Sequence, residues 1–122
     1  MPERDNLKNF GAYQKALELF EQVVSDLEPL VKNPALHRLI SQQYASADSV
    51  ASNIEEGYGR GSRRDFAHFL IISRGSVQET AGRYQRFKHW LPSSTIAARV
   101  ALCGEIIGIL SASIKTLRGD PG

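Results

Sequence analysis

Residues 95–117 have the sequence TIAARVALCGEIIGILSASIKTL, and their pattern decides the fold class. Apolar side chains recur here at alternating steps of three and four residues, which is the spacing of one face of an α-helix. The residues on this face are Ile96, Val100, Cys103, Ile107, Leu110, Ile114 and Leu117. The segment therefore predicts a helix that packs into the core of an all-α protein.

Three earlier segments repeat this spacing, and residues that stop or start helices separate them. Pro29 ends the first, because proline cannot continue a helix. Gly57 and Gly59 are expected to supply the positive backbone angles that end the second. Ser62 and Asp65 have the form of a capping box, which starts the third. We predict helices at about residues 9–28, 35–57, 63–91 and 95–117.

The length of the chain favours one core. It has 122 residues, 42% of them hydrophobic, which is enough to fill one core but not two. We expect a single domain over residues 1–122. Because the connections are short, neighbouring helices should run antiparallel, as in an up-down-up-down four-helix bundle.

The start of the chain, MPERDN at residues 1–6, lacks the basic and then apolar pattern of a secretion signal. No uncharged apolar run approaches the length that spans a bilayer. Cys103 is the single cysteine, so it cannot form an intramolecular disulfide, as is usual in a reducing compartment. We expect a cytoplasmic protein that does not contact membranes.

No pattern of catalytic or metal-binding residues stands out. The bundle lacks the Glu-x-x-His pairs of di-iron proteins, and His37, His68 and His89 do not have metal-ligand spacing. Cys103 lies on the apolar face of its helix, which favours a small buried side chain over a nucleophile. The glycines of residues 57–61 lack the lysine of a phosphate-binding loop. We expect no enzymatic activity, no metal and no cofactor.

Asn53, Glu56 and Gly57 form a polar motif at the end of the second predicted helix. Glu55 and Glu56 are adjacent, so they point about 100° apart on a helix and cannot act as a facing acid and base. A structural role is favoured, in which Asn53 and Glu56 hydrogen-bond backbone groups of the following turn or of a neighbouring helix.

Positive charge concentrates in residues 58–92, which carry seven basic and two acidic side chains. Two centres could contact phosphates. The candidate residues are Arg60, Arg63 and Arg64 at a helix start, and Arg83, Arg86 and Lys88 at a helix end, beside His89 and Trp90. A helix start also favours anions through its free amides, and Trp90 could stack on a base. The alternative is that the second group only complements the helix dipole and keeps the protein soluble.

The 95–117 helix carries more apolar surface than one core needs. Leu102, Ile106 and Ile109 form a second stripe, which predicts an interface between copies of the chain. Ala97, Ala101, Gly104 and Gly108 share one face of the same helix. These small residues fit close packing inside the monomer and an oligomer interface equally well.

The segment SVASNIEEGYGR at residues 49–60, followed by Asp65-Phe66 and Phe69-Leu70, resembles the 23S ribosomal-RNA intervening-sequence family. Tyr13-Gln14-Lys15-Ala16 is similar to that family's first-helix signature. The resemblance implies a four-helix bundle and a homopentamer, related to the accessory protein of diversity-generating retroelements, which binds nucleic acid and a reverse transcriptase. Family members often carry two arginines where this chain has Tyr44 and Ala45.

Together these patterns predict a non-enzymatic, self-associating protein that contacts RNA or DNA phosphates through a basic face on the 63–91 helix. Binding of this kind tolerates sequence changes and weakens with salt. The alternative is a scaffold that docks a partner protein such as a reverse transcriptase without binding nucleic acid. A third class is an enzyme with a shallow active site between its subunits, for which the sequence offers no candidate residues.

Overall fold

The computed structural model describes residues 4–119. All regular secondary structure in this range is helical, and the range contains no strand. This confirms the prediction of an all-helical chain with four long helices. The helices are α1 (Arg4–Leu7), α2 (Gly11–Leu27), α3 (His37–Tyr58), α4 (Arg63–Arg86) and α5 (Ser93–Leu117). Short 3-10 turns lie at Glu28–Leu30, Pro34–Leu36 and Phe87–His89. The short α1 was not predicted.

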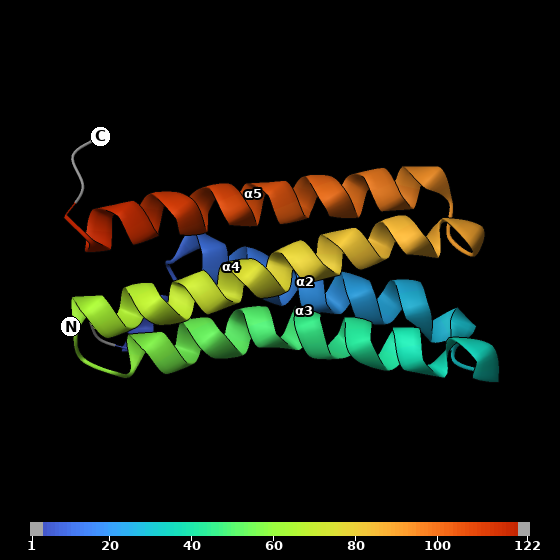
Figure 1. Cartoon of the computed structure of the whole chain (residues 1–122), viewed down its shortest axis with the longest axis horizontal. Coiled ribbons are helices and arrows are strands. Elements are labelled where there is room, and N and C mark those ends of the chain that lie inside the picture. Colours follow the sequence, from blue (N-terminus) through green and yellow to red (C-terminus); the bar gives the residue numbers. More distant parts are fainter. Residues whose placement is uncertain (1–3, 120–122) are drawn as a thin grey trace.

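The four long helices lie lengthwise beside one another (Figure 1). Helix α3 packs on α4, α4 packs on α5, and α2 packs on both α3 and α5. Each helix contributes apolar residues to one shared core, whose fully buried members include Leu19, Val23, Val50, Ile54, Leu70, Tyr84 and Leu110. The predicted three-and-four spacing corresponds to burial along α3, α4 and most of α5. On α2 the buried face lies beside the predicted one: Leu19 and Val23 are buried, whereas the predicted Leu17 is 45% exposed.

The turn between α3 and α4 differs from the prediction. Gly59 has a φ of −78°, so it stays in the ordinary helical region, and Gly57 lies within α3. The residue with a positive φ is Gly61, at 84°. Gly57 is instead buried against α4, where an added Cβ would lie 2.7 Å from Phe69 Cβ. Gly57 therefore allows α3 to approach α4 closely, whereas Gly61 allows the chain to reverse its direction.

Two contacts support the start of α4 as predicted. The side chain of Ser62 accepts a hydrogen bond from the backbone N–H of Asp65 at 3.1 Å, which satisfies one free amide of the helix start. Asp65 lies in the first turn, where a carboxylate interacts favourably with the helix dipole.

The second apolar stripe predicted for α5 is not an exposed face. Ile106 is fully buried in the core of the bundle, while Leu102 and Ile109 are half-buried and pack against that core. The bundle covers these residues because α5 packs on both α2 and α4. Glu105 and Lys115 of α5 are exposed, and the helix also has an exposed face of small residues, namely Ala97, Ala101, Gly104, Gly108 and Ala112.

Helix α5 has no long uncharged run, because Arg99 and Glu105 interrupt its apolar residues. Among the described residues it alone is nevertheless long and apolar enough overall to span a bilayer, with a mean hydropathy of 1.6. This finding concerns length and composition only. Within its most apolar stretch, 28% of the residues are buried in the bundle, so much of its apolar surface faces outward.

A polar network missed by the sequence analysis joins three helices. Arg99 of α5 donates from Nε and Nη2 to the two carboxylate oxygens of Asp26 on α2, at 2.8 and 3.0 Å. The hydroxyl of Tyr84 on α4 donates to the same carboxylate at 2.7 Å. Burial and the nearby carboxylate raise the pKa of Tyr84, so it remains a hydrogen-bond donor.

Candidate nucleic-acid interface

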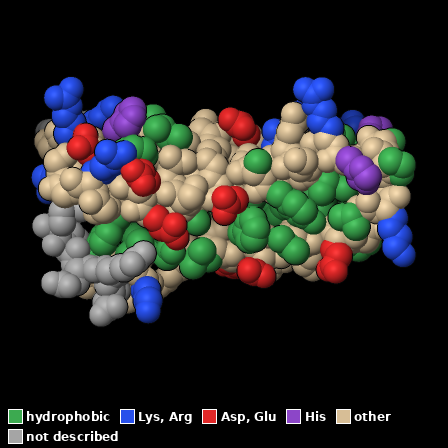
Figure 2. Space-filling model, turned by 90° about the horizontal axis from the view of Figure 1, so that it is seen from below, with side chains coloured by type: hydrophobic (Ala, Val, Ile, Leu, Met, Phe, Trp, Pro, Cys, Tyr) green, Lys and Arg blue, Asp and Glu red, His purple; other side chains and the backbone are tan. Residues whose placement is uncertain are grey.

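The basic residues of α4 do not form one continuous face. Arg64 and Arg86 are 22 residues apart on a straight helix, which at 1.5 Å per residue separates them by roughly 33 Å. Figure 2 shows Lys and Arg side chains toward the two ends of one face, with acidic and hydrophobic side chains between them. The two centres that the sequence predicts on this basic face are therefore two separate groups, one toward each end of α4.

The first group surrounds the start of α4. Arg63, Arg64 and His68 line a surface hollow of about 550 Å³ together with Arg118, which follows α5. Ala67, Ile71 and Leu117 complete its wall. We call Arg63, Arg64, His68 and Arg118 the end cluster. The packing of α4 on α5 thus adds His68 and Arg118 to the predicted arginines.

The arginines of the end cluster differ in their freedom. Nη2 of Arg63 donates to the backbone oxygen of Thr116 at 2.8 Å, which ties the start of α4 to the last turn of α5. Arg64 and Arg118 are exposed, and within residues 4–119 neither side chain forms a hydrogen bond or an ion pair. These two guanidinium groups are available to an external anion.

Arg60 was predicted to bind phosphates but already has partners. Its Nη2 lies 2.6 Å from Oε1 of Glu56, and its guanidinium carbon lies 5.0 Å from the ring centre of Phe69. Both groups are half exposed, so the ion pair adds little stability, but it neutralises Arg60 locally. The carboxylate of Glu56 thus contacts a side chain, which corrects the backbone role expected for it.

Asn53 also differs from expectation. Its side-chain Nδ2 donates to the backbone oxygen and to the hydroxyl of Ser49, both at 2.8 Å. These acceptors belong to the preceding turn of the same helix, not to the following turn or to a neighbouring helix. In the motif predicted as structural, Gly57 lies directly against the neighbouring helix α4.

The second group lies at the opposite end of α4. Arg86 and Lys88 are exposed, and so is Trp90, with 40% of its surface accessible. Trp90 packs edge to face against Phe87 and His89, with ring centres 6.2 and 5.5 Å away. Arg83, which was predicted to contact phosphates here, is 92% buried between α3 and α4 because polar side chains of α3 surround it.

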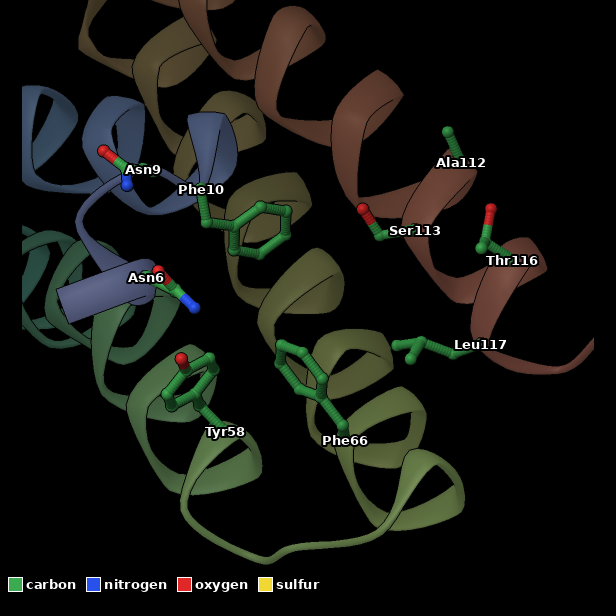
Figure 3. Close-up of a pocket in the computed structure, with 9 residues that line it drawn as sticks. All are labelled: Asn6, Asn9, Phe10, Tyr58, Phe66, Ala112, Ser113, Thr116 and Leu117. Carbon is green, nitrogen blue, oxygen red and sulfur yellow. The ribbon is translucent and has the colours of Figure 1, made fainter. Parts of the chain in front are cut away.

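An apolar pocket of about 460 Å³ lies at the same end of the bundle as the end cluster. Figure 3 shows the rings of Phe10, Tyr58 and Phe66 around it, with Ser113, Thr116 and Leu117 of α5 on the opposite side. Phe66 packs edge to face on both other rings. Leu117 lines this pocket and the hollow of the end cluster, so the two are adjacent.

Residues 8–110 match the family described as 23S rRNA-intervening sequence protein. The match covers most of the chain. The protein belongs to the 23S rRNA-intervening sequence protein family. A comparison with curated proteins found no match.

The matched region of this 23S rRNA-intervening sequence protein contains α2, α3, α4 and most of α5. Arg63, Arg64 and His68 lie inside it, whereas Arg118 lies beyond its last matched residue. Of the two unpaired arginines, Arg64 therefore lies in the part of the chain that defines the family.

Groups suited to other chemistry are sparse in the described part of this 23S rRNA-intervening sequence protein. Among residues 4–119, no three His, Cys, Asp or Glu side chains gather closely enough to hold a metal ion. Cys103 is fully buried in the core. Burial raises the pKa of its thiol to about 11, which keeps the thiolate, the reactive form, scarce at neutral pH.

Proposed function

We propose that this protein is a non-enzymatic, self-associating binding protein that contacts the phosphates of nucleic acid, and of RNA in the first place, through the end cluster. One observation carries the proposal: α4 and α5 bring Arg64 and Arg118 to one hollow, where both lack a partner among the described residues. The family description, which names ribosomal RNA, supports RNA as the ligand.

The electrostatics of this hollow favour a phosphate. Arg63, Arg64 and Arg118 provide three positive charges, and the free amides at the start of α4 add a partial positive charge. Contacts of this kind recognise the backbone and not the bases, so binding should tolerate sequence changes and weaken steeply with salt.

The apolar pocket supplies a possible contact for a base. Its aromatic walls suit a flat ring, and it is adjacent to the end cluster through Leu117. A base next to a bound phosphate can enter this pocket only when it is not paired. Single-stranded RNA should therefore bind more tightly than duplex of the same length.

Self-association would multiply these contacts. The exposed small face of α5 allows close approach of a second copy, and its apolar surface would leave water in the process. The proposed assembly is the homopentamer of antiparallel up-down bundles implied by the family resemblance. Five end clusters in one particle would turn weak single sites into strong overall binding.

Charge reversal tests the end cluster. Fluorescence anisotropy of labelled single-stranded RNA should show at least tenfold weaker binding by the Arg64→Glu/Arg118→Glu variant. Arg38→Glu is the matched control, because Arg38 is also an exposed arginine at the second position of a long helix. It should keep the affinity of the wild type. Equal binding by all three proteins would refute the end cluster as the site.

The same experiment separates the alternative function. If the wild type binds neither RNA nor DNA at low salt, the remaining candidate is the scaffold that docks a partner protein. In that case the exposed arginines would serve an acidic protein surface, and the anisotropy of every labelled nucleic acid would stay unchanged as protein is added.

A further inference from the structure

A polar seam runs through the interface between α3 and α4. Gln43 and Ser46 of α3 face Thr80 and Arg83 of α4, and all four are buried. Nε2 of Gln43 donates to the backbone oxygen of Thr80 at 2.9 Å, and the hydroxyls of Ser46 and Thr80 lie 2.8 Å apart. Buried polar groups are usually satisfied in this way, so an exception within the seam requires an explanation.

Arg83 is that exception. Its Nη1 is fully used, because it lies within 3.4 Å of Gln43 Oε1, Ser46 Oγ and the backbone oxygen of Gln42. Its Nε is buried and has no hydrogen-bond partner. Its Nη2 also makes no hydrogen bond within residues 4–119. The partnered side of the guanidinium thus fixes its position, while the Nε–Nη2 edge has no partner within residues 4–119.

The unpartnered edge is the one suited to an anion. Nε and Nη2 present two parallel N–H groups, the geometry that binds two oxygens of a phosphate or carboxylate. Among residues 4–119 no carboxylate lies within ion-pair distance of Arg83. A buried charge without a countercharge is costly, so an external anion would relieve a cost that the fold itself leaves in place.

A groove gives access to this position. It has a volume of about 400 Å³, far above the roughly 30 Å³ occupied by one water molecule in the liquid. Its walls are Gln42, Ala45, Ser46, Ser49, Ser76, Glu79 and Arg83. The hydroxyl of Ser76 donates to that of Ser49 at 2.9 Å, which places two polar groups beside the guanidinium.

Charged residues lie on and beside the groove. Glu79 favours the charged form of Arg83, whereas Arg86 opposes it. Burial is the largest effect and lowers the pKa of Arg83, although arginine remains charged at neutral pH. Arg83 and Glu79 are the charged residues that line the groove, and Arg86 lies close enough to influence Arg83.

We infer that the groove between α3 and α4 is a binding site for one oxyanion, held by the Nε–Nη2 edge of Arg83. The ligand chemistry is two oxygens of one anionic group, as in phosphate or a carboxylate. This site is separate from the end cluster, and it goes beyond the proposed binding of nucleic acid.

Titration of the ¹⁵N-labelled full chain with inorganic phosphate, at constant ionic strength, tests the inference. The Nε–H signal of Arg83 should shift and saturate with phosphate but not with chloride. Sodium acetate in a parallel titration distinguishes a carboxylate from a phosphate as the ligand, and saturation by either supports the site. No saturable shift with either anion would overturn the inference.

Three variants locate the effect. Arg86→Gln, the exposed neighbour, should keep the saturable shift. Arg83→Lys keeps the charge but lacks the paired N–H groups and the Nε–H signal, so its weaker binding is read from unfolding. If binding is at least tenfold weaker, phosphate at nine times the wild-type Kd should change the equilibrium constant for unfolding less than twofold. If Arg83 variants fail to fold, Ala45→Phe blocks the exposed groove wall without altering the buried seam, and it should abolish the shift of the Arg83 signal. An unchanged shift in Ala45→Phe would refute the groove as the site.

A stability measurement gives a second readout. At a phosphate concentration of nine times Kd, the equilibrium constant for unfolding should fall about tenfold in the wild type and stay unchanged in Ala45→Phe. The Arg64→Glu/Arg118→Glu variant should respond like the wild type. The two proposals can thus fail separately. Unchanged RNA binding by Arg64→Glu/Arg118→Glu would refute the end cluster, and a missing phosphate response in the wild type would refute the groove.

Discussion

Replacement of Gly57 by alanine should destabilise the protein, because α3 and α4 touch at this residue. The new Cβ would lie 2.7 Å from Phe69 Cβ and 3.1 Å from Phe66 Cδ1, where ordinary contacts are 3.4–4 Å. Since a Cβ is fixed to the backbone, relief requires the helices to separate by about 0.7 Å. Overpacking costs about 1–3 kcal/mol, and the better helix propensity of alanine returns about 0.5–1 kcal/mol.

The net expectation for Gly57→Ala is a loss of about 1–2 kcal/mol in the free energy of unfolding. Urea unfolding followed by circular dichroism, at one fixed protein concentration, measures it. Gly75→Ala is the matched control on α4, where an added Cβ meets none of the described atoms within 4 Å. It should stabilise by about 0.5–1 kcal/mol. Equal stabilisation by both variants would refute the close approach of α3 and α4 at Gly57.

Three further predictions concern the network, the cysteine and the small face of α5. Asp26→Asn should lower the free energy of unfolding by about 2–4 kcal/mol, because it leaves Arg99 without its buried countercharge; a urea midpoint equal to that of the wild type would contradict this. The Cys103 thiol has a folded pKa of about 11 against an ordinary 9.0, so the unfolded chain releases its proton first, and stability should fall between pH 9 and 11. Relative to Cys103→Ala this loss should reach roughly 2–3 kcal/mol in urea unfolding, and parallel pH profiles would argue against burial of the thiol. Gly104→Leu/Gly108→Leu places bulk on the exposed face of α5, so the mass measured by light scattering should drop to that of the monomer, whereas an unchanged mass would exclude this face as the interface.

The helices were predictable from the sequence because their apolar spacing and burial have the same cause. Leu110 and Ile114 lie on the predicted face of α5 and are buried. The neighbouring residues Ile106 and Ile107 were harder to assign to the core. Ile106 is fully buried, while Ile107, which was predicted on the core face, is only half-buried. One helix packed on two neighbours has a wide buried face, and spacing alone cannot show where that face ends.

The reversal at the end of α3 shows a different limit. Gly57, Gly59 and Gly61 are all chemically able to take a positive φ, and only Gly61 does so. The choice depends on how closely α3 and α4 approach, which is set by Phe66 and Phe69 on the next helix. Local sequence carries no information on that distance.

The candidate site was predicted only in part because burial of charged residues depends on tertiary packing. Arg64 was found from charge clustering, but the same clustering placed Arg83 on the surface. The polar residues Gln43 and Ser46 on the core-facing side of α3 are the sequence feature that could have indicated a buried arginine on α4, because they accept its hydrogen bonds. Arg118 was missed because it becomes a neighbour of Arg64 only when α5 packs on α4.

The salt dependence of RNA binding tests the central claim most directly. Each phosphate contact contributes about −0.7 to the slope of log K against log salt for single strands. Removal of two contacts in Arg64→Ala/Arg118→Ala should therefore make the slope less steep by about 1.4 per cluster engaged, while Arg38→Ala should keep the slope of the wild type. A slope that is the same in all three proteins would contradict phosphate binding by the end cluster.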